Sequence, residues 1–170
     1  ISQIIRICEG NPRIAYMAGK LALKSKKISS ITNITTLYNK YYNNYINEYL
    51  ENNRDLCFTA GILSAVKAVK LDNISSLKEI LYFYGVDDKK IIDNIYALSK
   101  LEVVEIYDGK IASFSDKCLS NYMIYYVFIH KKIIPFSKLL ELGYKYYSYN
   151  FKEMIKMLFN LFNSDEINGH

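Results

Sequence analysis

The spacing of apolar residues changes once along this 170-residue chain, and the change falls beside a turn signal. Val103 to Tyr107 and Lys110 to Phe114 have the composition of short β-strands. Asp108-Gly109 between them is typical of a two-residue hairpin connection, because both residues tolerate a left-handed backbone. The sequence therefore predicts a two-stranded β-hairpin that turns at Asp108-Gly109.

Upstream of the hairpin the apolar residues follow a helical period. We expect helices over Leu56 to Val69, Ser76 to about Tyr84, and Asp88 to Lys100. Ser75 and Asp87 are predicted to cap the second and third of these helices, and Gly85 to end the second. Three helices followed by a hairpin form a winged-helix arrangement.

Helical patterns also flank this unit. Ser115 or Asp116 is predicted to cap a helix from Lys117 to about His130, and Pro135 to begin a further helical segment. On the N-terminal side, a stripe of apolar and tyrosine residues runs from Leu37 to near Asn53. Before it, the Ser and Thr residues near position 30 are typical of a loop.

The predicted fold class is mainly α, with three parts. These are a small helical unit over residues 1–54, a winged-helix domain with a two-stranded β wing over 55–130, and a helical C-terminal extension over 131–170. A chain of this length with 51% hydrophobic residues can bury a core. It begins with Ile1 and ends in a polar run, so we interpret it as a piece of a longer protein.

The longest uncharged apolar stretch, Cys118 to Ile129, is too short to cross a bilayer, so we expect no membrane association and a cytoplasmic protein. Cys8, Cys57 and Cys118 are scattered at apolar positions, which predicts buried reduced thiols. His130 and His170 have no Cys, Asp or Glu at ligand spacing, so no metal site is expected.

The candidate functional residues stand between the first two helical segments. Gly10 suits the position after a helix over Ser2 to Glu9, Asn11 caps the next helix, and Pro12 is its first residue. The second helix is predicted to continue to about Lys24. Arg13 then lies at a helix N-terminus, where exposed N–H groups and the helix dipole favour an anion. The segment has two interpretations, a plain helix junction or a contact for a bound phosphate.

The order of elements resembles the part of a STAND-type ATPase that follows its nucleotide-binding core; STAND proteins are signalling relatives of the AAA+ ATPases. "CEGNPRIAYMAGKLAL" is similar to the lid segment of large bacterial STAND proteins, and "FSDKCLSNYMIYYVFI" to the end of their winged helix. The resemblance covers most of the chain, and its sharpest part is the four residues Gly10 to Arg13.

The resemblance implies that Gly10, Asn11, Pro12 and Arg13 face a bound nucleotide. In STAND lids the proline packs against the nucleotide, and in the related sensor 2 helix an arginine approaches the terminal phosphates. On this hypothesis the Arg13 guanidinium lies at an exposed helix start and has no carboxylate partner within the chain. A plain junction would instead pair Arg13 internally, with Glu9 as one candidate partner.

The second candidate contact is Ser115-Asp116. The corresponding site of STAND winged helices often has a His-Asp pair, in which the histidine reaches the bound diphosphate and the aspartate caps the helix. Asp116 matches the cap, whereas Ser115 replaces the histidine and offers one hydrogen bond without a charge. We expect Asp116 to be a structural cap and leave phosphate sensing by Ser115 open.

Catalytic motifs for ATP hydrolysis are not found in these 170 residues. The sequence contains no Gly-x-x-x-x-Gly-Lys-Ser/Thr loop and no apolar strand that ends in paired acids. The resemblance therefore implies a non-catalytic lid and winged helix of a parent ATPase. Its cofactor is ATP or ADP on the nucleotide-binding core of the same chain, and none is expected to bind tightly to these 170 residues alone. Its role is to relay the nucleotide state, and self-oligomerisation of the parent stays open.

Two other classes of function are kept as alternatives. A winged-helix DNA-binding regulator would use Asp88 to Lys100 for recognition, but that helix has a net charge of only +1. Residues 55–116 hold seven basic and ten acidic residues, a net of −3, whereas phosphate contact needs clustered Lys and Arg. A helical protein-interaction module would use the tyrosines at helical spacing, Tyr38, Tyr42, Tyr45 and Tyr49.

Overall fold

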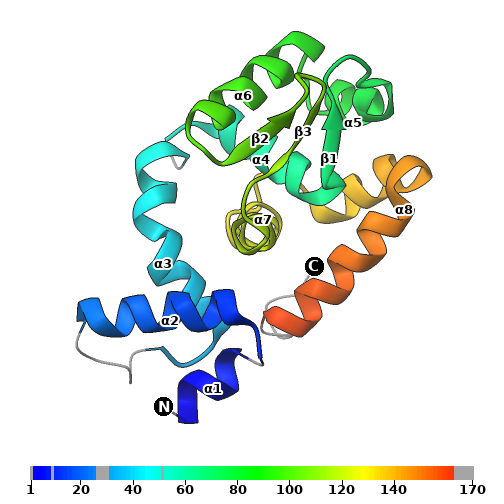
Figure 1. Cartoon of the computed structure of the whole chain (residues 1–170). Helices are drawn as coiled ribbons and strands as arrows, with labels where there is room; N and C mark the ends of the chain where they lie inside the picture. Colours follow the sequence, from blue (N-terminus) through cyan, green and yellow to red (C-terminus); the bar gives the residue numbers. More distant parts are fainter. Residues whose placement is uncertain (1, 9, 26–30, 51, 163–170) are drawn as a thin grey trace.

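The computed structural model describes residues 2–8, 10–25, 31–50 and 52–162. The chain is mainly helical with a small antiparallel sheet, which agrees with the mainly α class predicted from the sequence (Figure 1). In chain order the elements are α1 (Ser2–Cys8), α2 (Pro12–Ser25), α3 (Ile34–Tyr49), α4 (Arg54–Val66), β1 (Ala68–Lys70), η1 (Ser75–Leu77), α5 (Lys78–Phe83), α6 (Asp88–Lys100), β2 (Val104–Tyr107), β3 (Ile111–Phe114), α7 (Lys117–Ile124), η2 (Tyr125–His130) and α8 (Phe136–Leu161).

The junction between α1 and α2 has the local geometry that the sequence predicts. Gly10 has φ +79°, the left-handed conformation expected after a helix end. The Asn11 side-chain oxygen accepts hydrogen bonds from the backbone N–H groups of Arg13 and Ile14, at 3.0 and 3.3 Å. Pro12 is the first residue of α2, where its missing N–H leaves no bond unmade.

Helix α4 lies at the centre of the fold. Every residue from Leu56 to Val66 is buried, which explains why this helix is apolar on all sides. Its neighbours include α6, α7, α8 and the sheet. A Cβ atom added to Gly61 would lie 2.6 Å from Cγ1 of Val127, so the glycine permits close contact between α4 and η2.

The predicted helix over Leu56 to Val69 is wrong at its end. Helix α4 stops at Val66, and Lys67 has φ +72°, a conformation that breaks the helix. The chain then forms β1, whose Val69 pairs with Ala112 of β3. Three strands are therefore present where two were predicted.

The sheet has the strand order β1-β3-β2, and both pairings are antiparallel. The predicted hairpin is confirmed: β2 and β3 pair from Val104↔Phe114 to Tyr107↔Ile111. Asp108 and Gly109 both have positive φ, +50° and +66°, as a tight two-residue connection requires.

Of the two caps predicted for the middle helices, Asp87 is confirmed and Ser75 is wrong. Asp87 accepts a hydrogen bond from the backbone N–H of Lys90 at 2.8 Å and caps α6. Ser75 does not cap a helix; it is the first residue of the short 3-10 helix η1, and its N–H is bound by the side chain of Asn73. Gly85 follows α5 with φ +66°, as expected.

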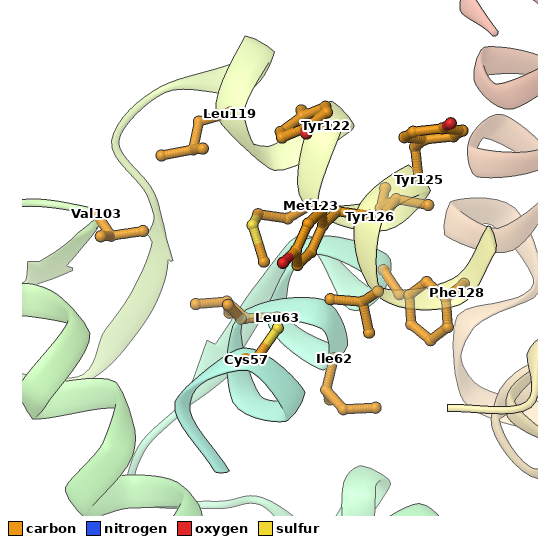
Figure 2. Packing of buried hydrophobic residues seen from close by; sticks show 14 of the residues in the cluster. Cys57, Ile62, Leu63, Val103, Leu119, Tyr122, Met123, Tyr125, Tyr126 and Phe128 are labelled. Atoms are coloured by element: carbon orange, nitrogen blue, oxygen red, sulfur yellow. The ribbon is translucent and has the colours of Figure 1, made fainter. Parts of the chain in front are cut away.

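The predicted helix over 117–130 is present as α7 followed by the buried π-helix η2. Figure 2 shows Met123 and Tyr126 lying over Leu63 of α4. Helix α8 follows Pro135 and has a kink at Tyr147, where φ is −126° and ψ is 22°. In Figure 1 α7 is seen end-on between α3 and α8.

Buried side chains from all three predicted parts belong to one hydrophobic cluster, which extends from Cys8 to Phe162. Cys8, Cys57 and Cys118 are buried thiols, as predicted. Within the described ranges, none of the helices combines the length and the hydropathy needed to span a membrane.

Candidate functional site

The two segments singled out from the sequence, Gly10 to Arg13 and Ser115-Asp116, meet in the structure. The Arg13 Nη2 atom lies 2.6 Å from Oδ2 of Asp116 and donates a hydrogen bond to it. The two residues are 103 positions apart in the chain. The contact joins the first turn of α2 to the cap of α7.

Asp116 holds both of its carboxylate oxygens in hydrogen bonds. Oδ1 accepts from the backbone N–H groups of Cys118 and Leu119, at 2.8 and 3.4 Å, so the predicted cap of α7 is confirmed. Oδ2 accepts from Arg13 and, at 3.2 Å, from the hydroxyl of Tyr42 on α3. One carboxylate thus connects α2, α3 and α7.

The charges at this cluster stabilise each other. Partial burial favours a higher pKa for Asp116, but the hydrogen bonds from Arg13 and from the Cys118 N–H outweigh it and lower that pKa. The hydrogen bond to Asp116 is the main cause that raises the pKa of the Arg13 guanidinium. Burial, with the negative charge of Asp116 second, raises the pKa of Tyr42, so its hydroxyl stays a donor.

One expectation about Arg13 is wrong. Pro12 and Arg13 are exposed at the start of a helix, as the lid hypothesis expects, but the guanidinium does have a carboxylate partner within the chain. That partner is Asp116 across the fold; Glu9, suggested from the sequence, lies outside the described residues. The Arg13 side chain is still 48% exposed.

The Ser115 hydroxyl bonds to backbone carbonyls of the segment before β2 and takes no part in the Arg13–Asp116 contact. Its Oγ is within hydrogen-bonding distance of two backbone carbonyls, those of Glu102 at 2.7 Å and Val103 at 2.9 Å. A hydroxyl has one proton to donate, and here it is used by these carbonyls. A contact from Ser115 to a phosphate would require that proton to be redirected.

Sequence analysis did not identify the tyrosines of α3 as the link between the N-terminal helices and the rest of the chain. Besides Tyr42, the Tyr45 hydroxyl donates to the Leu101 carbonyl at 3.2 Å, and the Asn39 side-chain oxygen accepts from the Tyr122 hydroxyl at 2.5 Å. The rings of Tyr42 and Tyr122 are stacked with centroids 5.6 Å apart. The regular spacing of these tyrosines indicates one face of a helix, but it does not indicate which helix that face packs against.

A pocket of about 380 Å³ lies beside the start of α2, and neither Arg13 nor Asp116 lines it. Its polar lining includes the side chains of Arg6, Asn11, Thr32, Asn33 and Asn160. Among the residues that the structure describes, no group of three or more His, Cys, Asp or Glu side chains is placed to bind a metal ion. The chemistry available at this junction is hydrogen bonding and charge pairing by Arg13 and the amide side chains.

Comparisons of the chain with protein families, with curated proteins and with solved structures gave no match.

Proposed function

We propose that this chain is the non-catalytic lid and winged-helix region of a STAND-type ATPase, which senses ATP or ADP on a nucleotide-binding core of the same protein. The observation that supports it most is that the segment of Gly10 to Arg13 and the segment of Ser115-Asp116 meet in the fold. The ion pair itself, taken alone, is what a plain helix junction predicts. Each segment resembles a nucleotide-facing element of that family. A shared nucleotide would require the two segments to be neighbours, and they are.

The order of the middle elements also supports the proposal. Helices α4, α5 and α6 precede a hairpin of β2 and β3, and β1 adds a third strand to it. Three helices with a small antiparallel sheet suit a winged helix, in which β2 and β3 form the wing. Asp116, which caps α7, follows two residues after the end of β3.

In this proposal the Arg13–Asp116 pair is a switchable contact between lid and winged helix. Arg13 has five N–H donors, and its Nη2 atom donates to the Asp116 carboxylate. A half-exposed ion pair contributes only about 0–1 kcal/mol, so a phosphate could compete for the guanidinium without unfolding the junction. Coupling between sites of about 1–3 kcal/mol is typical of such relays.

The DNA-binding alternative has less support. Helix α6 would present Asp88, Lys89, Asp93 and Lys100 on its exposed side, together with Lys90. The Lys90 ammonium is 3.1 Å from the carboxylate of Asp55, so part of its charge is already neutralised. Backbone phosphates need unneutralised Lys and Arg side chains.

The interaction-module alternative depended on the tyrosine stripe of α3. Tyr38 and Tyr42 are buried, and Tyr45 is half-buried, in contacts with α7 and the end of α6. Packing within the chain therefore accounts for most of the stripe, and Tyr49 alone of these four is exposed.

The protein sequence upstream of Ile1 tests the proposal. A phosphate-binding Gly-x-x-x-x-Gly-Lys-Ser/Thr loop within a few hundred residues, and ATP or ADP binding by the protein that contains it, would support the assignment. A continuous protein without such a loop, or one with the loop that binds neither nucleotide, would contradict it.

A further inference from the structure

A pocket of about 640 Å³ opens between the end of α4, the start of α7 and the second half of α8. Three lysines from these three elements line it: Lys67, Lys117 and Lys156. Amide side chains of Asn11, Asn121, Asn150 and Asn160 also line it. Apolar and aromatic residues complete the lining, so the pocket combines hydrogen-bond donors with an apolar wall. Its volume is in the range of small-molecule sites.

The positive charge at this pocket is only partly neutralised. Glu153, the acidic residue of the lining, has its Oε1 atom 2.8 Å from the Lys156 ammonium. Lys67 and Lys117 have no carboxylate partner within residues 2–8, 10–25, 31–50 and 52–162. Lys67 and Lys117 therefore line one open pocket, and neither forms an ion pair within the described part of the chain.

Lys67 is held in this environment by its backbone. Its N–H donates to the Leu63 carbonyl at 2.8 Å, and its φ of +72° is a conformation that non-glycine residues rarely adopt. The Asn150 amide donates to the Val66 carbonyl at 2.6 Å, which fixes the end of α4 against α8. Burial, with the charge of Lys117 second, lowers the pKa of Lys67.

We propose that this pocket binds a small phosphate-bearing anion, held between the ammonium groups of Lys67 and Lys117. Ammonium groups are compact charges with three rotatable donors each, which suits phosphate oxygens. The volume accommodates more than a single phosphate, so a diphosphate group is the natural probe. Asn11 of the proposed nucleotide-facing segment lines the pocket, but Arg13 and Ser115 do not. Because the inference is carried by Lys67 and Lys117, it does not depend on the proposed nucleotide-sensing role.

Calorimetric titration of the 170-residue chain with inorganic pyrophosphate tests the inference. We expect saturable binding with a dissociation constant below about 1 mM. Lys67→Met and Lys117→Met should each weaken it about tenfold or more, whereas Lys67→Arg, which keeps the charge, should retain it within about threefold.

The control is Lys110→Met, which removes the same charge from the hairpin, away from the pocket lining. It should change the affinity less than about twofold. Thermal melts establish whether each variant is folded. If Lys67→Met does not fold, Lys117→Met still tests the pocket. No saturable binding by the wild-type chain, or an equal loss in Lys110→Met, would overturn the inference.

Titration with ADP in the same variants identifies the source of the phosphate group. ADP binding that is lost with Lys67→Met and that pyrophosphate displaces would assign a nucleotide to this pocket. Pyrophosphate binding without ADP binding would assign a non-nucleotide phosphate. Both results support a phosphate site in this pocket, and neither depends on Arg13. A failure of the lid proposal can therefore be told apart from a failure of the pocket proposal.

Discussion

Arg13 and Asp116 form an ion pair with 2.6 Å between Nη2 and Oδ2, although 103 positions separate them in the chain. The Asp116 side chain is 22% exposed and the Arg13 side chain 48%. The carboxylate is held by the α7 cap and by Tyr42, whereas the guanidinium lies at the surface. The pair thus joins a carboxylate that is held by several hydrogen bonds to a guanidinium at the surface.

Arg13→Ala should lower the free energy of unfolding of the chain by less than about 1 kcal/mol, because the pair is half-exposed and screened by solvent. Urea unfolding at low and high salt measures it, and the loss should shrink as salt increases. Lys90→Ala, which removes the exposed pair with Asp55, is the matched control and should have an effect of similar size. A loss above about 3 kcal/mol would show that Arg13 is a structural residue and not a switchable contact.

The stability of the chain should depend on the ionisation of Asp116. Its pKa is lowered in the folded state, so the carboxylate stabilises the fold at neutral pH. This contribution is lost as the pH falls below about 4, the pKa of an aspartate in an unfolded chain, and then through the lower folded pKa.

Asp116→Asn keeps a capping oxygen but removes the charge. The variant should be less stable than the wild-type chain at pH 7, and the difference should shrink toward pH 3, in urea unfolding across that range. Asp87→Asn is the control, since Asp87 caps α6 through the Lys90 N–H without an ion pair among the described residues. A difference for Asp116→Asn that does not change with pH would contradict the charge pairing.

Gly61→Ala should destabilise the fold by about 1–3 kcal/mol, because the new methyl group would lie 2.6 Å from Cγ1 of Val127 in a packed core. Thermal unfolding measures the loss, and Val127→Ala in the same chain should recover part of it. The control is Gly19→Ala in α2, where no atom lies within 4 Å of the added Cβ, and where about 1 kcal/mol of stabilisation is expected. Equal effects at both glycines would contradict the close α4–η2 contact.

Local signals in the sequence predicted the local structure of this chain well. The hairpin at Asp108-Gly109, the caps at Asn11, Asp87 and Asp116, and the glycine turn at Gly10 were all predicted from residues within a few positions of each feature. Each depends on a local backbone conformation, or on a side chain that accepts a hydrogen bond from the first turn of the helix it caps. Such features need no knowledge of the rest of the fold.

Features that depend on distant residues were missed. The apolar run before Val69 carries no break signal, and β1 exists because β3 supplies its hydrogen-bond partner. Neither Lys67, where α4 ends, nor Tyr147, where α8 is kinked, is a glycine or a proline. The ion pair of Arg13 with Asp116 was missed for the same reason. The resemblance placed both segments near one nucleotide, but no local signal at either residue indicates a direct pair between them.

The central claim is that the Arg13–Asp116 contact relays nucleotide state, and the affinities of the full-length protein for ATP and ADP test it most directly. We predict that Arg13→Ala changes the ratio of the two affinities about fivefold or more, while Lys90→Ala leaves the ratio unchanged and both variants keep nearly wild-type melting temperatures. Unchanged ATP and ADP affinities in the folded Arg13→Ala protein would contradict the claim and leave the contact a helix junction alone.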